Sequence, residues 1–171
     1  LEATLSNIDI TCFGLDDGVV TTTINGGTSP YVYSWTGPNN FTSTSSSIST
    51  LSSGNYYLDL LDDNGCSDTA IISISEPSIL EAFSLVSDGA SFGVSCYGFS
   101  NGKVEITVNG GILPYYVTYN SSSPTTSSSQ LFTFENLSAG PGNFDVIDGN
   151  GCSLLGSPII ITQPPELVIV S

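Results

Sequence analysis

The chain has 171 residues, of which 16 are acidic, one is basic and none is histidine, so its formal net charge is −15. Nucleic acid is not expected as a partner, because its binding depends on basic residues that neutralise phosphates, and anionic membrane surfaces are disfavoured for the same reason. The lack of histidine excludes Ser-His-Asp and Cys-His catalysis.

Three sequence blocks occur twice, about 85 residues apart. The pairs are "CFGLDDGVVTTTI" at 12–24 with "CYGFSNGKVEITV" at 96–108, "INGGTSPYVYSW" at 24–35 with "VNGGILPYYVTY" at 108–119, and "DLLDDNGC" at 59–66 with "DVIDGNGC" at 145–152. A fixed period of this kind indicates tandem copies of one structural unit. The copy length is ordinary for a small all-β domain.

The repeat predicts two tandem domains and the beginning of a third. We expect the first repeat over residues 1–78, the second over residues 79–165, and the start of a following repeat over residues 166–171. The chain therefore reads as two units of a longer array, joined by short linkers that contain proline.

Alternating apolar residues predict antiparallel β-strands in both copies. In chain order, the side chains expected on the inward face of the first copy are Val20, Thr22, Ile24, Tyr31, Tyr33, Trp35, Leu58, Leu60, Ala70, Ile72 and Ile74. Those of the second copy are Val104, Ile106, Val108, Tyr115, Val117, Tyr119, Phe144, Val146, Ile159 and Ile161. No helical period occurs, so each copy is predicted to be an all-β antiparallel sandwich of about seven strands.

Four cysteines occupy matching places in the two copies. If each copy is a self-contained domain, the expected pairs are Cys12–Cys66 and Cys96–Cys152, one of the three pairings that four cysteines allow. Each internal disulfide would stabilise its domain by about 4 kcal/mol and implies an oxidising, extracytoplasmic setting. Free thiols are the alternative, and a zinc site lacks the CxxC or histidine ligands that it needs.

The order of the motifs resembles the SprB repeat. The motifs are C-x-G-x-x-D/N-G, N-G-G-x-x-P-Y, G-N-Y/F, D-x-N-G-C and E/Q-P, and they cover both copies. SprB repeats occur in very large cell-surface adhesins of gliding bacteria. The resemblance implies an immunoglobulin-like module, without a catalytic motif, in a secreted filament at the bacterial cell surface. The second copy departs from the pattern at Asn101 and Gln163, where the first copy has acidic residues.

Acidic residues in the turns raise the alternative of calcium binding. The candidate ligands are Asp62, Asn64, Asp148 and Asn150 in the D-x-N-G turns, and Glu76, Glu81 and Asp88 at the junction of the copies. An EF-hand loop spreads its ligands over twelve residues and ends in a bidentate glutamate, which is absent here. Tight turns with glycine at positive φ explain the motif better, so no cofactor is predicted, with calcium as the alternative.

Two other chemistries have simpler explanations. The carboxylate pairs Asp16–Asp17 and Asp62–Asp63 could hydrolyse glycosides, but turns explain them better because neither pair recurs in the second copy. The aromatic residues of the second strand could stack on sugars, but such a set is more often core. Tyr57 and Tyr116 are the rings expected to be exposed, and Lys103 is expected to be an exposed strand lysine.

The sequence predicts a non-catalytic structural and adhesive repeat, a semi-rigid spacer in surface attachment and gliding motility. Its expected partners are neighbouring repeats of the same chain, with an external surface or polysaccharide as a possible ligand. Direct membrane insertion is not expected, because no apolar run approaches the ~18 residues that a membrane span needs. The alternatives are a carbohydrate-binding module and a non-catalytic appendage of a secreted enzyme.

Overall fold

A computed structural model describes residues 1–87 and 93–169. It divides the chain into two compact units, unit 1 (Leu1–Pro77) and unit 2 (Ser78–Ser171), a division one residue before the expected boundary. Regular structure in the described residues consists of β-strands and one short 3-10 turn, η1 (Pro38–Asn40). No helix in these residues has the length and apolar character needed to cross a membrane.

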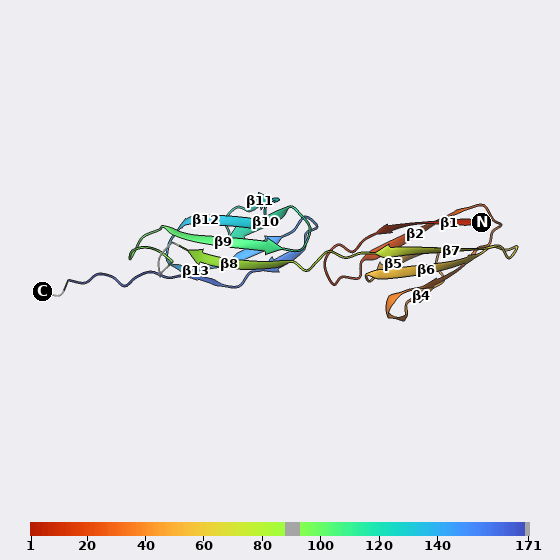
Figure 1. Ribbon diagram of the computed structural model, residues 1–171, viewed down its shortest axis with the longest axis horizontal. Helices are drawn as coiled ribbons and strands as arrows, with labels where there is room; N and C mark the ends of the chain where they lie inside the picture. Colours follow the sequence, from red (N-terminus) through yellow and green to blue (C-terminus); the bar gives the residue numbers. More distant parts are fainter. Residues whose placement is uncertain (88–92, 170–171) are drawn as a thin grey trace. The chain divides into compact units, whose positions relative to one another are not determined.

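Unit 1 is made of two antiparallel sheets (Figure 1), with strand orders β1-β2-β5 and β4-β3-β6-β7. Its strands are β1 (Glu2–Ile8), β2 (Gly18–Asn25), β3 (Val32–Thr36), β4 (Thr42–Ser43), β5 (Ser47–Leu51), β6 (Gly54–Leu61) and β7 (Ser67–Ile74). The longest ladder is the β6–β7 hairpin, whose strands pair without a break from Gly54↔Ile74 to Leu61↔Ser67.

Unit 2 has the same plan, with sheets β12-β9-β8 and β11-β10-β14-β15 and a separate pair, β13-β16. Its strands are β8 (Glu81–Ser87), β9 (Gly102–Asn109), β10 (Tyr115–Tyr119), β11 (Thr125–Ser127), β12 (Leu131–Leu137), β13 (Gly140–Gly142), β14 (Phe144–Ile147), β15 (Ser153–Leu155) and β16 (Ile159–Ile161). Strands β13 and β14 replace β6, and β15 and β16 replace β7. The long hairpin is therefore split into two ladders.

Each unit has its own core between its sheets, and most of the residues that the alternation predicts to face inward belong to it. In unit 1 the fully buried residues include Val20, Trp35, Leu58, Leu60 and Ile74, with Ile24, Tyr31, Tyr33, Ala70 and Ile72 packed against them. In unit 2 all ten predicted inward residues, from Val104 to Ile161, are buried. The predicted all-β fold of two antiparallel sandwiches is confirmed.

The hydrogen bonds of unit 1 define an entry end and an exit end. The Ala3 N–H donates to Asp68 Oδ2 at 2.7 Å, so the start of the chain lies beside the start of β7. The Ile10 N–H donates to the Ser75 carbonyl at 3.0 Å, so the β1–β2 connection lies beside the end of β7. The chain therefore enters unit 1 at one end of the sandwich and leaves it at the other (Figure 1).

Unit 2 has the same two ends. The Gly111 N–H donates to the carbonyl of Ser78, the first residue of the unit, at 2.9 Å, so the entry end lies where β9 ends. The Val94 N–H donates to the Thr162 carbonyl at 3.0 Å, so the segment before β9 lies beside the chain that leaves the unit after β16. Entry and exit are again separated by the length of the strands.

Candidate functional site

The motifs of the repeat gather at the two ends of each unit. At the exit end of unit 1, residues 11–17 form a closed loop, here named the cysteine loop. The Thr11 N–H donates to Asp17 Oδ1 at 3.0 Å, and the Leu15 N–H donates to the Cys12 carbonyl at 3.1 Å. The hydrogen bond from the Thr11 hydroxyl lowers the pKa of the Asp17 carboxyl below its ordinary value. Asp17 thus closes the cysteine loop by accepting hydrogen bonds from the N–H and the hydroxyl of Thr11.

A glutamate side chain fastens the cysteine loop to the end of unit 1. The Gly14 N–H donates to Glu76 Oε2 at 3.0 Å, and the Ser53 hydroxyl donates to Glu76 Oε1 at 3.0 Å. Gly14 has φ +75°, a conformation that glycine adopts without the steric cost of a Cβ. Glu76 directly precedes Pro77, the last residue of the unit, so the loop lies where the chain leaves.

Unit 2 repeats this loop at residues 95–101 with different acceptors. The contacts are Ser95 N–H to Asn101 Oδ1 (3.1 Å), Phe99 N–H to the Cys96 carbonyl (3.1 Å) and Gly98 N–H to Gln163 Oε1 (3.1 Å). Asn101 and Gln163 are the departures noted in the sequence. Each keeps the acceptor oxygen of the acidic residue in the first copy and removes its charge, so the loop keeps its shape.

At the entry end of unit 1, residues 62–66 form a tight turn built around one carboxylate, here named the aspartate turn. Asp62 is 4% exposed. Its Oδ1 accepts the N–H groups of Asn64 at 3.0 Å and Cys66 at 2.7 Å, and its Oδ2 accepts the Thr28 N–H at 2.9 Å. The hydrogen bond from the Thr28 N–H is the largest of the contributions that lower the pKa of Asp62 below its ordinary value. Burial of the carboxyl raises the pKa, but by less than the hydrogen bonds lower it.

The aspartate turn of unit 2, residues 148–152, is built in the same way. Asp148 is 1% exposed; its Oδ1 accepts the N–H groups of Asn150 and Cys152, both at 2.9 Å, and its Oδ2 accepts the Ile112 N–H at 2.8 Å. In both units the carboxylate joins its own turn to the loop after the preceding N-G-G motif. The sequence predicts the turn, but not the hydrogen bond that Thr28 or Ile112 donates to its carboxylate.

The contacts of the calcium candidates are those of turn residues. Both oxygens of Asp62 and of Asp148 already accept backbone N–H groups, and the Asn64 side-chain amide donates to Thr28 Oγ1 at 2.9 Å. In residues 1–87 and 93–169, no three His, Cys, Asp or Glu side chains form a group that could hold a metal ion. Asp88 lies outside the described residues. The structure adds no argument for calcium at these positions.

The predicted internal disulfides, Cys12–Cys66 and Cys96–Cys152, are wrong. Cys66 and Cys96 carry free, exposed thiols. In each unit one cysteine lies in the cysteine loop at the exit end and the other in the aspartate turn at the entry end. Strand β7 separates the two ends of unit 1 by about 23 Å at 3.3 Å per residue, whereas the Cα atoms of a disulfide lie no more than about 7 Å apart.

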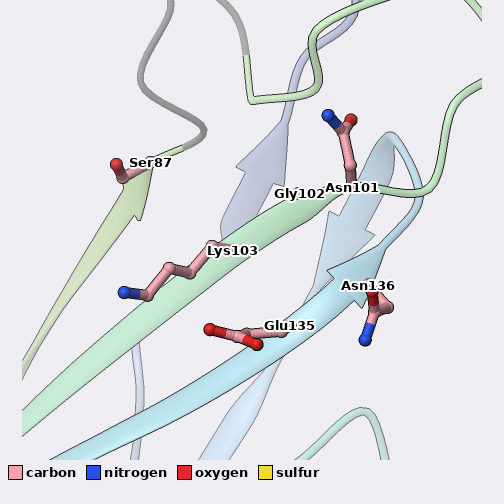
Figure 2. A pocket seen from close by; sticks show the side chains of 6 residues that line it. All are labelled: Ser87, Asn101, Gly102, Lys103, Glu135 and Asn136. Carbon is pink, nitrogen blue, oxygen red and sulfur yellow. The ribbon is translucent and has the colours of Figure 1, made fainter.

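The single basic residue of the chain, Lys103, forms an ion pair on the surface of unit 2. Lys103 Nζ lies 2.7 Å from Glu105 Oε1 on the same strand, and this hydrogen bond raises the pKa of the lysine. Figure 2 shows Lys103 on β9 beside Glu135 of β12, with its side chain extending away from Asn136. Both residues line a pocket of about 230 Å³. Lys103 is thus a strand lysine, as the sequence predicts, but it is partly buried, with a side chain that is 37% exposed.

The aromatic residues of the second strand belong to the core. Trp35 is 1% exposed and its Nε1–H donates to the Ser45 carbonyl at 3.0 Å. Tyr115 is 3% exposed, and its hydroxyl donates to the Gly110 carbonyl at 2.5 Å. Tyr57 and Tyr116 are the exposed rings, as predicted. The strand therefore offers no row of exposed rings for stacking on sugars.

The sequence reasoning missed an apolar pair in each cysteine loop. Phe13 and Leu15 of unit 1 are 52% and 47% exposed, and Tyr97 and Phe99 in the matching places of unit 2 are 49% and 55% exposed. A signal for them was available, because large apolar residues recur at the same two places of a glycine-containing loop in both copies.

The family model of the SprB repeat matches residues 6–40 and 94–120. Three solved structures are similar over both units: murine CEACAM1b (11% identity, 95% of this chain and 100% of that chain covered, TM-score 0.38), CbhA fibronectin(III)-like modules of Clostridium thermocellum (13%, 95% and 95%, 0.40) and the amphioxus IgVJ-C2 molecule (11%, 95% and 97%, 0.38). No curated protein matches the chain. The resemblance predicted from the motif order is thus confirmed, since each unit contains a segment that matches the SprB repeat.

Proposed function

We propose that the chain is a non-catalytic structural repeat of a large adhesin on the bacterial cell surface, and that its units act as semi-rigid spacers in surface attachment and gliding motility. The SprB match in both units supports the assignment to a surface adhesin. The observation that carries the spacer role is the position of the chain ends, because each unit is entered at one end of its sandwich and left at the other.

Because the chain enters and leaves each unit at opposite ends, every added repeat lengthens the adhesin. Strand β7 alone spans about 23 Å, so each copy moves the chain by at least that distance. The linker supports stiffness, since Glu76 is held by Gly14 and Ser53 and Pro77 restricts φ. In tandem arrays of this kind each repeat interacts chiefly with its neighbours, so neighbouring repeats are the expected partners.

The carbohydrate-binding alternative lacks its main support, because the aromatic strand faces the core in both units. We therefore expect an external surface or polysaccharide to be bound by another part of the adhesin, or by weak contacts repeated in every unit. Glycan-array binding by this two-unit chain, abolished by Tyr57→Ala or Tyr116→Ala, would favour the carbohydrate-binding function instead.

Small-angle X-ray scattering of chains with one, two and four repeats tests the spacer role. The expected result is a maximum dimension that rises by a similar increment, at least about 23 Å, with each repeat. A dimension that levels off, as for a collapsed cluster of domains, would contradict it. The biological role can be tested in cells that carry an adhesin with fewer repeats and no other change. Such cells are expected to bind surfaces at shorter range.

A further inference from the structure

Asparagine is followed directly by glycine at five places in the chain, and such pairs can lose the side-chain amide. The backbone nitrogen of the glycine attacks the amide carbon of the asparagine, and the lack of a Cβ on glycine makes this approach easy. The surroundings of each pair decide whether the two groups can meet. The pairs are Asn25–Gly26, Asn64–Gly65, Asn101–Gly102, Asn109–Gly110 and Asn150–Gly151.

The pair in the aspartate turn of unit 1 is held at both residues. The Asn64 N–H donates to Asp62 Oδ1 at 3.0 Å, and the Asn64 side-chain amide donates to Thr28 Oγ1 at 2.9 Å. The nitrogen that would attack, that of Gly65, donates to the Asp62 carbonyl at 3.0 Å. Both reacting groups are thus engaged elsewhere, and their hydrogen bonds have to break before they can meet.

The matching pair in unit 2 is held in the same turn. The Asn150 N–H donates to Asp148 Oδ1 at 2.9 Å. The Gly151 N–H donates to the Asp148 carbonyl at 3.0 Å. The buried carboxylate of Asp148 therefore fixes the backbone on which this asparagine lies.

The pair in the cysteine loop of unit 2 is held through its side chain. Asn101 Oδ1 accepts the Ser95 N–H at 3.1 Å, and Asn101 Nδ2 donates to Ser95 Oγ at 2.7 Å. Gly102 is the first residue of β9 and is buried. The amide cannot leave Ser95 without opening the loop.

The two pairs of the N-G-G motif are not held in this way. Asn25 is the last residue of β2 and Asn109 is the last residue of β9, and both are exposed. Within residues 1–87 and 93–169, neither asparagine side chain has a hydrogen-bond partner. Gly26 and Gly110 lie outside the strands, and their N–H groups form no hydrogen bond with the described backbone.

Both N-G-G asparagines also lie where a β-ladder ends. Asn25 pairs with Glu2, the first residue of β1, and Asn109 pairs with Glu81, the first residue of β8. Hydrogen bonds at the end of a ladder open more easily than those in its middle. The backbone at these asparagines therefore has the freedom that the attack requires.

We propose that Asn25 and Asn109 are sites of spontaneous deamidation, and that the aspartate turns and the cysteine loop protect the other three asparagines. Asn25 reacts faster than Asn109. The reason is that Gly111, directly after Gly110, donates its N–H to the Ser78 carbonyl at 2.9 Å and both glycines are half-buried, whereas Gly26 is exposed.

The reaction needs only water and base. The Gly26 nitrogen loses its proton and bonds to Cγ of Asn25, and the C–N bond to the side-chain amide breaks. The amide nitrogen takes up a proton and leaves as ammonia, so a five-membered cyclic imide remains. Water then opens one of the two C–N bonds of the imide, giving aspartate or isoaspartate. One water is consumed and one ammonia is released, and no group is oxidised or reduced.

Each deamidation changes the charge and the loop. A neutral amide becomes a carboxylate, so the chain gains one negative charge at each event. Isoaspartate also inserts a methylene into the main chain before Gly26 or Gly110, whose carbonyls accept the hydroxyls of Tyr31 at 3.0 Å and Tyr115 at 2.5 Å. The loop after β2 or β9 thus records the time since synthesis. This inference does not depend on the spacer role or on what the adhesin binds.

Peptide mapping of the aged protein tests the proposal. The folded chain is kept at pH 8 and 37 °C, and peptides are analysed by mass spectrometry and by methylation with an isoaspartyl methyltransferase. We expect deamidation at Asn25 first, then at Asn109. The other three asparagines should react at least about tenfold more slowly, because their hydrogen bonds must break first. Equal rates at all five sites, or a faster reaction at Asn64, Asn101 or Asn150, would overturn the proposal.

The unfolded chain and two kinds of variant are the controls. In denaturant the protected asparagines should approach the rate of Asn25, whereas rates that stay apart would show that folding does not protect them. Asn25→Gln lengthens the side chain and should abolish the first charge change in isoelectric focusing. Thr28→Val removes the acceptor of the Asn64 amide but keeps the Thr28 N–H, and it should speed deamidation at Asn64 but not at Asn150. An unchanged rate at Asn64 would contradict the protection.

Discussion

Units 1 and 2 share a fold and differ in the middle of their longest hairpin. In unit 1 the β6–β7 ladder is continuous, whereas in unit 2 it is split into β13–β16 and β14–β15. At the split, the Asn143 N–H donates to Asn120 Oδ1 at 2.8 Å, and Pro158 has no N–H to give to a ladder. The side chains at this point also differ, since unit 1 pairs Leu58 with Ala70, whereas unit 2 has Phe144 and Gly156 in the matching places.

The two ends of the units, by contrast, are built from the same contacts. Each aspartate turn accepts three backbone N–H groups, and each cysteine loop is closed by a side-chain oxygen, from Asp17 in unit 1 and Asn101 in unit 2. The comparison teaches that the strands of this repeat tolerate breaks and exchanges, while the ends keep one geometry. The ends are where the chain enters and leaves each unit.

The largest effect is expected from removing the carboxylate of an aspartate turn. Asp148→Ala leaves three N–H groups without their acceptor, and we expect unit 2 to lose about 3 kcal/mol of unfolding free energy. Asp148→Asn, which keeps one carbonyl oxygen, is the control and should lose less. Denaturant unfolding checks this, and an unchanged midpoint in the alanine variant would show that the turn is held by other contacts.

An exchange of side chains across the split hairpin should show coupling. A Cβ on Gly156 would lie 2.2 Å from the Phe144 ring, so Gly156→Ala is expected to cost about 2 kcal/mol through overpacking. Adding Phe144→Leu reproduces the Leu58 and Ala70 pair of unit 1 and should recover part of this loss. Thermal unfolding of the two single variants and the double variant measures the coupling, and strictly additive effects would contradict this account.

A polar atom in unit 1 offers a smaller, stabilising change. Thr22 Oγ1 is buried and has no hydrogen-bond partner among the described residues, and unit 2 has Ile106 in the matching place. Thr22→Val keeps the shape and removes the hydroxyl, so we expect a gain of about 1 kcal/mol. The reverse exchange, Ile106→Thr, should destabilise unit 2. Denaturant unfolding that shows a loss for Thr22→Val would mean that the hydroxyl does have a partner.

Acid should weaken unit 1 more than unit 2. The pKa values of Asp9, Asp17 and Asp62 are lowered by hydrogen bonds, chiefly from Ser75, Thr11 and Thr28. A lowered pKa in the folded state means that the stabilisation is present above the ordinary value near 4 and is lost as the pH falls below it.

Unit 2 has glycine and asparagine in the places of Asp9 and Asp17, so it has fewer such groups to protonate. Asp17→Asn should therefore reduce the acid sensitivity of unit 1. Amide hydrogen exchange at pH 6 and pH 3 would separate the units, and equal loss of protection in both would contradict the comparison.

The strands and the core could be predicted from the sequence because period-two alternation is a local pattern. Val104, Ile106 and Val108 alternate with polar residues, and the burial follows. The aspartate turns could be predicted for the same reason, since Asp, Asn and Gly act within five residues. Their third hydrogen bond, from Thr28 or Ile112, depends on which loops share an end of the sandwich, and no local pattern carries that.

The cysteine pairing failed for a reason of topology. Strands β2 and β6 each carry the chain from the exit end of unit 1 to its entry end, and the segment from β3 to β5 brings it back between them. Cys12, before β2, and Cys66, after β6, therefore lie at opposite ends. The assumption of self-contained domains paired cysteines that lie at opposite ends of a unit, because it ignored the direction of the strands.

The distance between Cys12 and Cys66 tests the central claim most directly. In the chain with Cys96→Ser and Cys152→Ser, spin labels on the two remaining cysteines would report this distance by double electron–electron resonance. The structure predicts a separation above about 20 Å, the length of the strands between the ends. A narrow distribution below about 10 Å, close enough for the sulfurs to bond within one unit, would contradict the account.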